Sequence, residues 1–366
     1  MSILDTGIKN IRNVSRCTLG AGSLAELPQL LLRRKQEHPG PVLFFADQFL
    51  EGSDSIKKLN RGPADKLIFV ASAHEPSTDG IDAIVADLRA TGFQKPNCIV
   101  GLGGGTTMDT AKAVANLLTN GGKAEEYQGW DLVKVPGVYK IAVPTISGTG
   151  AEATRTCVMT NTRTGLKLGM NSDFTTYDHV IMDPSLTATV PKNQYFYTGV
   201  DSYFHSMEVL AGSYRNVIGD AFSREGLTLC REVFLSNDMM SDDNRERLMI
   251  ASYFGGCAIA TSSTGLVHPF SAGLSVVLGT HHGLANCIVM RAMQPYYPKE
   301  FEEFWSMVKR QGVEIPEGVC RDLTDAQYGA LYDSTIIHGK PLTNALGENF
   351  RDMLTPEKVK EIFKQM

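Results

Sequence analysis

The chain has 366 residues, of which 43% are hydrophobic and 20% are charged. This length and composition exclude a small disulfide-stapled scaffold and an intrinsically disordered chain, and they allow two globular domains. Lysine and arginine together number 35 against 40 acidic residues, which gives a formal net charge of -5. Because this balance provides no basic field for a phosphate backbone, nucleic acid is not expected as a partner.

The seven cysteines are widely spaced and contain no CxxC pair. This pattern indicates reduced, mostly buried thiols in a reducing compartment rather than disulfides or a cysteine zinc site. The N-terminal segment MSILDTGIKNIRN has no apolar core of the kind found in secretory signals, and no stretch approaches the roughly 18 apolar residues of a membrane span. The sequence therefore predicts a cytoplasmic protein without a membrane partner.

Short β-branched segments alternate with helical patterns from residue 40 to about residue 185. Such alternation predicts a doubly wound, Rossmann-like parallel sheet that is covered by helices on both faces. The strands are expected at 42–47, 66–72, 97–102, 139–145 and 180–183.

The helix expected after the third of these strands has a recognisable start. Thr106 is the predicted N-cap, and Asp109 follows three residues later, as in a capping box. An apolar face follows at helical spacing. Its members are Met108, Ala111, Ala115 and Leu118.

The pattern changes after Asp183, where Pro184 and Pro191 punctuate the chain. Helical periods then continue to the C-terminus, with breakers such as Pro269, Gly279 and Pro316. We therefore expect an α/β domain over residues 1–186 and an all-α domain over residues 187–366.

Two glycine-rich loops follow predicted strands. In GLGGGTTMDTAK (101–112), three consecutive glycines precede a helix, whose free N–H groups favour an anion such as a pyrophosphate. The alternative is a tight turn without a ligand. PTISGTGAEAT (144–154) follows another strand, and loops at the carboxyl ends of parallel strands face one crevice. Together the loops favour a dinucleotide.

Asp47 closes the first predicted strand. A carboxylate at this position can accept hydrogen bonds from a ribose diol and repel a 2′-phosphate, which favours NAD over NADP. The alternative is that Asp47 caps the helix that follows.

A metal site is predicted in the second half of the chain. Asp201 and His205 are four residues apart and project from one face of a helix, while His268, His281 and His282 lie in an apolar setting further on. One carboxylate and three imidazoles suit Zn(II) or Fe(II). The alternative is a set of unrelated core histidines. A metal combined with a nicotinamide implies alcohol oxidation.

These motifs together resemble the iron-containing (group III) alcohol dehydrogenase family, over nearly the whole chain. The resemblance implies the dehydroquinate synthase-like architecture of that family, a homodimer, and metal ligands at Asp201, His205, His268 and His282. It also implies a set of residues that bind the dinucleotide. These are Gly103, Gly104, Gly105, Thr106, Asp109, Thr145, Ser147 and Thr149.

Further positions follow from the same resemblance. The family spacing of fourteen residues selects His282 over His281, which becomes a candidate to support the ligands or face the substrate. Lys167 lies where the family often has a lysine near the cofactor. The chain departs from the family at Thr106, where serine is usual, and at Ala272, where many members carry a histidine thought to relay a proton.

Within the family, the segments 127–156, HPFSAG, THHG and 341–350 are most similar to the 3-deoxy-D-manno-octulosonate (Kdo) 8-oxidases. That similarity implies oxidation of the C8 hydroxyl of Kdo, before a PLP-dependent aminotransferase forms the 8-amino sugar of lipopolysaccharide, and makes Arg155 and the YQGWD segment candidate substrate contacts. Three alternatives stay open. They are a dehydrogenase of a simple alcohol, diol or other sugar, a dehydroquinate synthase-like lyase, and a non-catalytic nucleotide-binding protein.

Overall fold

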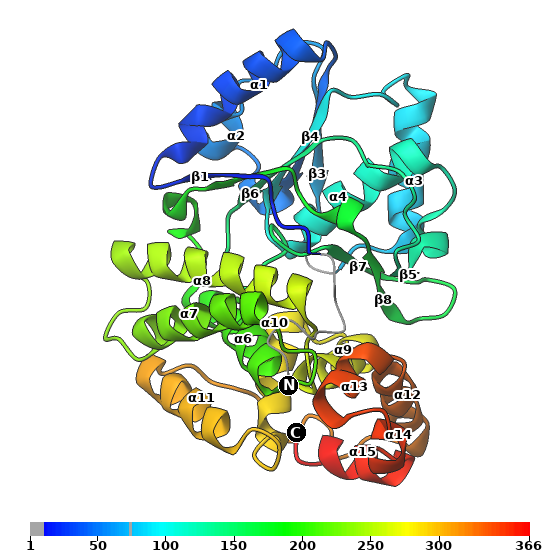
Figure 1. The fold of residues 1–366 in the computed structure, drawn as a ribbon, viewed down its shortest axis with the longest axis vertical. Coiled ribbons are helices and arrows are strands. Elements are labelled where there is room, and N and C mark those ends of the chain that lie inside the picture. Colours follow the sequence, from blue (N-terminus) through cyan, green and yellow to red (C-terminus); the bar gives the residue numbers. More distant parts are fainter. Residues whose placement is uncertain (1–10, 73–74) are drawn as a thin grey trace. The chain divides into compact units, whose positions relative to one another are not determined.

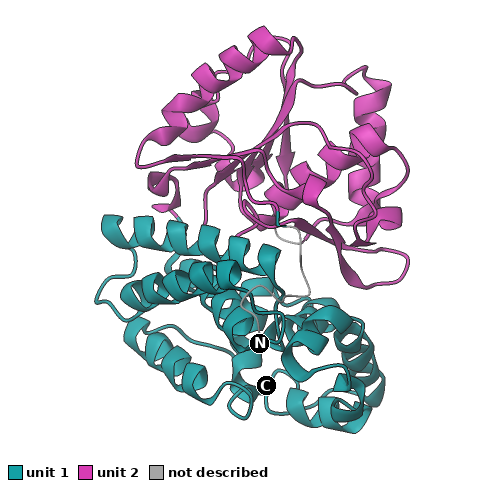
Figure 2. Cartoon of the chain, in the orientation of Figure 1, with its two compact units in different colours: residues 1–11, 147–149, 190–366 teal, residues 12–146, 150–189 magenta. Residues whose placement is uncertain are grey.

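The computed structural model describes residues 11–72 and 75–366. Residues 1–10, where the sequence predicts no targeting segment, lie outside this range. The described residues form two compact units (Figure 2). The α/β unit comprises Arg12–Ile146 and Gly150–Thr189, and the helical unit comprises Ser147–Thr149 and Val190–Met366 together with Ile11.

The join lies between residues 189 and 190, three residues after the predicted position. The physical reason is Asp183, whose carboxylate accepts the backbone N–H groups of Gly22 at 2.9 Å and Leu24 at 3.1 Å. These bonds hold the segment after the last strand to the α/β unit.

A six-stranded sheet forms the centre of the α/β unit, and all of its strand pairs are parallel. The strand order is β1-β9-β6-β4-β2-β3. This arrangement confirms the predicted doubly wound parallel sheet, and each predicted strand is present. The bounds are β1 Arg16–Leu19, β2 Val42–Asp47, β3 Lys66–Val70, β4 Cys98–Gly103, β6 Lys140–Pro144 and β9 His179–Met182.

Helices cover both faces of this sheet, with α1 and α2 on one side and α3 and α4 on the other (Figure 1). Alternate residues of β2, such as Val42 and Phe44, pack in the core beneath α1 and α2. On the other face, α4 approaches so closely that a Cβ at Gly101 would lie 3.3 Å from the Ala111 methyl group. The bounds are α1 Leu27–Glu37, α2 Asp54–Lys58, α3 Thr78–Ala90 and α4 Gly105–Asn120.

The strand order reverses direction between β2 and β4. From β2 the chain adds β3 on one side, and it then adds β4, β6 and β9 on the other. In open α/β sheets, the crevice outside the carboxyl ends of the strands at such a switch point is where ligands bind. Here the residues at those ends are Asp47 and Gly103.

A second, three-stranded sheet with the order β5-β8-β7 completes the unit. The sequence pattern does not predict this sheet. β7 and β8 form an antiparallel hairpin, and the two-residue β5 pairs with β8 in parallel. The bounds are β5 Gly129–Trp130, β7 Thr156–Thr160 and β8 Lys167–Asn171.

The second unit is helical, as predicted. Its core contains aromatic side chains in edge or tilted contact, including Phe196, Phe234 and Phe304. The predicted break at Gly279 is present, since this residue ends α9 in the left-handed conformation. The bounds are α5 Lys192–Gly199, α6 Asp201–Ala211, α7 Val217–Phe234, α8 Asp242–Thr261, α9 Val267–Leu278, α10 His282–Val289, α11 Pro298–Gln311, α12 Asp325–Ile336, α13 Gly339–Leu346, α14 Phe350–Met353 and α15 Pro356–Phe363.

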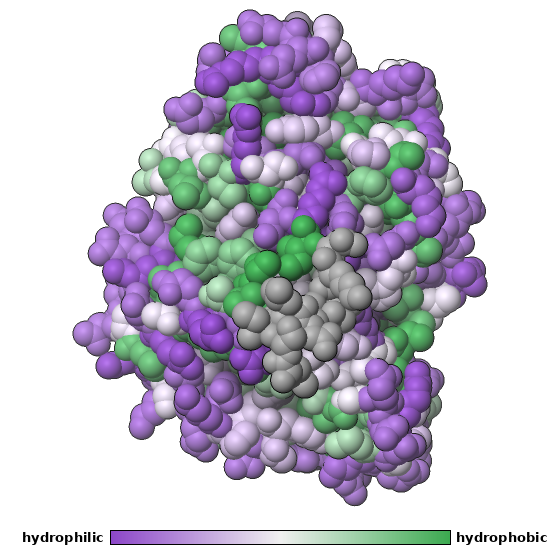
Figure 3. Space-filling model, viewed as in Figure 1, coloured by the Kyte–Doolittle hydropathy of each residue, from purple (hydrophilic) through white to green (hydrophobic). Residues whose placement is uncertain are grey.

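Hydrophilic residues occupy most of the outer margin of the face shown in Figure 3, and hydrophobic residues form smaller areas on it. Within the described ranges, none of the helices combines the length and the apolar character needed to cross a bilayer.

Candidate dinucleotide and metal sites

The first glycine-rich loop leaves the start of α4 open. The prediction that Thr106 caps this helix is wrong, because α4 begins at Gly105 with Gly104 as its N-cap, and no side chain bonds to the cap. The helix thus begins two residues earlier than the cap pattern indicated, and glycine suits the new cap position because a Cβ at Gly104 would lie only 2.9 Å from the Ile146 side chain. The first N–H groups of the helix therefore remain available to an anion.

Asp47 and Gly103 lie next to each other at the switch point. A Cβ on Gly103 would be 3.1 Å from the Asp47 Cβ and 2.7 Å from the Thr107 hydroxyl, so the close approach requires glycine. One carboxylate oxygen of Asp47, Oδ1, accepts the Phe49 N–H and the Ser72 hydroxyl, each at 3.0 Å. Asp47 thus caps the short helix after β2, which was the alternative interpretation, while no hydrogen bond from the described residues reaches Oδ2.

The tip of the second glycine-rich loop, Ser147–Thr149, belongs to the helical unit. The Gly148 N–H donates to the Ser252 hydroxyl at 2.8 Å, and its carbonyl accepts the Ser202 hydroxyl at 3.2 Å. Ser202 directly follows Asp201, so the loop tip is attached to the first turn of the helix that carries two of the predicted metal ligands. The Ser147 hydroxyl is buried without a partner, which suits a ligand contact.

Asp109 and Lys112 link α4 to the start of β7. Asp109 Oδ2 accepts the Val158 N–H at 2.9 Å, and burial raises the pKa of this carboxyl to about 6. The Lys112 ammonium is fully buried and donates to the Thr154 carbonyl and hydroxyl and to the Thr156 carbonyl, at 2.8 to 3.0 Å. Both side chains therefore position the helix whose N-terminus faces the predicted pyrophosphate.

Replacing Lys112 with methionine should destabilise the protein by about 2 to 4 kcal/mol, because the buried carbonyl and hydroxyl of Thr154 would lose their donor and the Thr156 carbonyl would lose one of two donors. Equilibrium unfolding in urea measures this change. The control is Lys57→Met, which removes an exposed ion pair with Asp54 and should cost less than about 1 kcal/mol. Equal losses in the two variants would contradict the role of Lys112.

The four predicted metal ligands converge in the helical unit. Asp201 Oδ1 lies 3.2 Å from His268 Nε2 and 3.6 Å from His205 Nε2, and Asp201 Oδ2 lies 3.5 Å from His282 Nε2. The ligand atoms of Asp201, His205 and His268 all lie within 4.8 Å of one another, and His282 approaches the second oxygen of Asp201. One carboxylate and three imidazoles are ligand types that zinc and iron sites use. The rings of His205 and His268 are stacked, with centroids 4.7 Å apart.

Glycines allow the helices that carry these ligands to approach. Gly283 follows His282, and a Cβ there would lie 2.6 Å from the Tyr197 carbonyl oxygen of α5. Gly255 of α8 faces α6, where its Cβ would lie 3.3 Å from Ser202 Cα. The glycine after the last ligand is thus needed for packing, whatever its other roles.

The electrostatics of the cluster fit a cation. Burial opposes the ionisation of Asp201, but His205 and His282 hold the pKa of its carboxyl well below the usual range. Burial lowers the pKa of His205 to about 3; it would do the same to His268, but Glu208 and Asp201 raise the pKa of that ring to about 10. Asp201 Oδ2 is buried without a hydrogen-bond partner, which is costly unless a cation faces it.

Two further residues contact the cluster, and neither was among the residues predicted from the sequence. Glu208 Oε2 bonds to His268 Nδ1 at 2.5 Å, and the Asn286 amide donates to Asp201 Oδ1 at 2.7 Å. Helical spacing was the available signal, since Glu208 lies three residues after His205 and Asn286 four residues after His282. His281, the candidate from the sequence, is exposed at the N-cap of α10.

Other predicted contacts have partners within the α/β unit. Lys167 in β8 forms an ion pair with Glu75. Arg155 forms ion pairs with Asp131 of the YQGWD segment and, at 3.2 Å, with Asp173. A substrate carboxylate would therefore compete with two aspartates for the Arg155 guanidinium.

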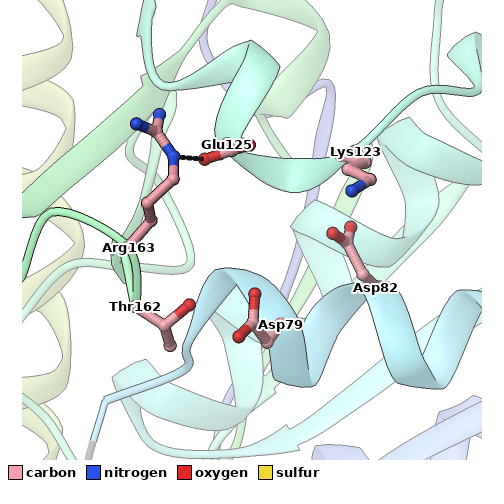
Figure 4. Close-up of a pocket in the computed structure, with 6 residues that line it drawn as sticks. All are labelled: Asp79, Asp82, Lys123, Glu125, Thr162 and Arg163. Carbon is pink, nitrogen blue, oxygen red and sulfur yellow. Dashed lines mark hydrogen bonds and ion pairs between the residues drawn. The ribbon is translucent and has the colours of Figure 1, made fainter.

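A pocket of about 300 Å³ lies on the α/β unit (Figure 4). None of the predicted site residues lines it, and its Arg163 side chain donates to Glu125 at 3.0 Å. Its lining residues are Asp79, Asp82, Lys123, Glu125, Thr162 and Arg163.

Comparison with known sequences identifies relatives. The chain is 32% identical over 231 residues to a sulfoacetaldehyde reductase of Bilophila wadsworthia, an alignment that covers 62% of this chain and 58% of that protein. It is 28% identical over 285 residues to an NAD-dependent methanol dehydrogenase of Bacillus methanolicus, covering 74% and 71% of the two chains. The first alignment therefore spans little more than half of the relative.

Solved structures share the fold over nearly the whole chain. A 1,3-propanediol oxidoreductase superposes with a TM-score of 0.83 at 20% identity, covering 97% of this chain and 99% of that one. A sulfoacetaldehyde reductase of Bifidobacterium kashiwanohense in complex with NAD+ superposes with a TM-score of 0.79 at 20% identity, covering 97% of each chain.

The family assignment follows from matches to both halves. Residues 15–184 match iron-containing alcohol dehydrogenases, and residues 195–317 match the C-terminal region of the same family. The chain therefore belongs to the iron-containing alcohol dehydrogenase family.

Proposed function

We propose that this protein is a metal-dependent dehydrogenase that uses NAD to oxidise a primary alcohol to an aldehyde. The observation that carries the proposal is the convergence of three imidazoles on Asp201, a fully buried carboxylate with an unpartnered oxygen. Asp201, His205, His268 and His282 would hold iron, or zinc in its place. A divalent ion in such a site acts as a Lewis acid on the alcohol oxygen, while a nicotinamide accepts the hydride.

The chain's own residues supply the remaining functions. The open N-terminus of α4 would hold the pyrophosphate, and Asp47 the adenosine ribose. Ala272, four residues after His268, has no group that can transfer a proton, so the hydroxyl proton must leave by a route other than the family histidine. The NAD-dependent methanol dehydrogenase among the relatives and the NAD+ complex among the similar structures support the choice of cofactor.

For the substrate, we propose the C8 hydroxyl of Kdo, with the aldehyde product passing to a PLP-dependent aminotransferase. Support comes from the sequence similarity described above and from Ala272. The second candidate is reduction of a small anionic aldehyde, favoured by the 32% identity to a sulfoacetaldehyde reductase. From the family resemblance we also propose that the protein forms a homodimer.

The deciding experiment measures NAD and NADP reduction by the purified protein with Kdo and with a panel of simple alcohols and diols. Each assay is run with and without Fe(II), Zn(II) or Mn(II), and NADH oxidation with sulfoacetaldehyde is measured in parallel. Metal-dependent turnover with Kdo alone would support the 8-oxidase proposal. Turnover only with simple alcohols or sulfoacetaldehyde would overturn that substrate, and absence of net NAD reduction or NADH oxidation with every substrate would overturn the dehydrogenase proposal.

Cofactor preference provides a separate prediction. Asp47→Asn keeps an oxygen that can accept the Phe49 N–H but removes the charge that would repel a 2′-phosphate. We expect the ratio of kcat/KM for NADP to that for NAD to rise by about tenfold or more, since a charge repulsion of about 1.4 kcal/mol is enough for that change. An unchanged ratio would show that Asp47 serves only as a cap.

A further inference from the structure

We infer that Glu208 is a positioning residue for the metal site: it fixes the tautomer and orientation of His268 so that Nε2 is the ligating nitrogen. This inference rests on the proposed metal site and adds a residue to it. Glu208 lies on α6, on the same helix as Asp201 and His205, and its side chain is fully buried.

Both carboxylate oxygens of Glu208 accept hydrogen bonds from the start of α9. Oε1 accepts the Val267 N–H at 2.5 Å, and Oε2 lies 2.5 Å from His268 Nδ1. The other ring nitrogen, Nε2, then faces Asp201 Oδ1 at 3.2 Å. A carboxylate can only accept, so the bond to Oε2 keeps a proton on Nδ1, and Nε2, which faces Asp201, is the nitrogen at which a metal would take the place of a proton.

The environment explains how a fully buried charge is tolerated here. Glu208 lies at the N-terminus of the twelve-residue α9, where free N–H groups and the helix dipole favour a negative charge. The backbone N–H of the preceding residue, Leu266, donates to the Tyr297 hydroxyl at 3.2 Å. A Cβ at Gly265 would lie 2.6 Å from that hydroxyl and 3.2 Å from Glu208 Oε1, so the segment before α9 is held closely.

The charges also balance. Asp201 and Glu208 contribute two negative charges, and the three imidazoles are neutral when they bind a metal. One divalent ion makes the site neutral. All three rings approach Asp201 through Nε2, whereas Nδ1 is buried without a partner in His205 and His282 and bonded to the Glu208 carboxylate in His268.

Glu208→Gln is a sharp test because glutamine has nearly the same shape but only one acceptor oxygen. If that oxygen accepts the Val267 N–H, the amide NH2 group faces His268 Nδ1 and drives the proton to Nε2, where it blocks the metal. If the oxygen turns to His268, the NH2 group opposes the Val267 N–H. Either arrangement disturbs the ligand.

The experiment strips the full-length protein of metal and titrates it with Co(II) and Zn(II) in competition with a chromophoric chelator, recording the Co(II) visible spectrum. We expect Glu208→Gln to bind about 10- to 100-fold more weakly than the unmodified protein and to show a changed spectrum. The control is Glu303→Gln, in which a glutamate bonded to Arg231 and Tyr203 in the same unit is altered. It should lower thermal stability without changing the affinity or the spectrum.

Equal metal affinity and equal spectra for Glu208→Gln and the unmodified protein would overturn the inference. Failure of the unmodified protein to bind either metal would instead overturn the proposed function. Should Glu208→Gln not fold, nitrogen NMR of the zinc-loaded, histidine-labelled unmodified protein gives the answer. We expect His268 as the Nδ1–H tautomer, and an Nε2–H tautomer would overturn the inference.

Discussion

His268→Ala is expected to abolish metal binding and turnover while leaving dinucleotide binding by the α/β unit intact. Removing His268 takes away one of the converging ligands and leaves the buried Glu208 carboxylate without its ring partner. The loss of metal affinity should exceed the roughly 10- to 100-fold loss expected when a residue that hydrogen-bonds to a metal ligand is changed. Metal content after dialysis and NADH fluorescence titration measure the two effects separately.

His281→Ala and His282→Ala provide the matched controls, because these neighbours differ in the assignment. The His282 ring lies 3.5 Å from Asp201 Oδ2, whereas His281 is exposed. We expect the His282 variant to lose the metal and the His281 variant to keep it. Unchanged turnover in His268→Ala, or loss of metal in His281→Ala alone, would contradict the metal site.

Gly148→Ala should produce the largest effect of any single methyl addition in the glycine-rich loops. Gly148 has a φ of +143°, and a Cβ there would lie 1.6 Å from the Thr198 carbonyl oxygen. Neither the new Cβ of residue 148 nor the Thr198 carbonyl oxygen can turn aside, since the backbone sets the position of each. The loop tip must therefore move, which should cost about 3 kcal/mol or more. Dinucleotide affinity should fall with it, since Ser147 and Thr149 flank this residue.

Gly165→Ala separates the clash from backbone strain. Gly165 also has a positive φ, +73°, but a Cβ there would meet nothing within 4 Å. That variant should lose only about 1 kcal/mol. Urea unfolding measures the free energy of unfolding of both variants. Equal losses would show that the clash with Thr198 adds nothing to the cost of Gly148→Ala.

The parallel sheet was predictable because its strands carry a strong local signal. β2 and β4 are continuous apolar segments that are buried on both faces, and turn or loop residues bound them. The second sheet was not predictable. Lys167–Asn171 carries lysine, glycine and asparagine, and its pairing with Thr156–Thr160 depends on partners elsewhere in the chain.

The metal ligands illustrate the same distinction. Asp201 and His205 share a helix, so helical spacing alone predicted that they lie on one face. Their meeting with His268 and His282 depends on packing between α6, α9 and α10, and spacing alone left unrelated core histidines as the alternative. The family resemblance selected His282, and the contacts with Asp201 agree with that choice.

The sequence by itself determined the alternation of the central parallel strands with helices, the helical character of the second unit, the glycine-rich turns and the chemistry of the ligands, because these depend on local periodicity and residue type. Only the tertiary structure decided that Gly104 rather than Thr106 caps α4, that the loop tip at Gly148 packs beside Ser202, and that Glu208 bonds to His268. The physical reason is that caps, close approaches and buried hydrogen bonds depend on which surfaces meet, and those surfaces are brought together by residues far apart in the chain.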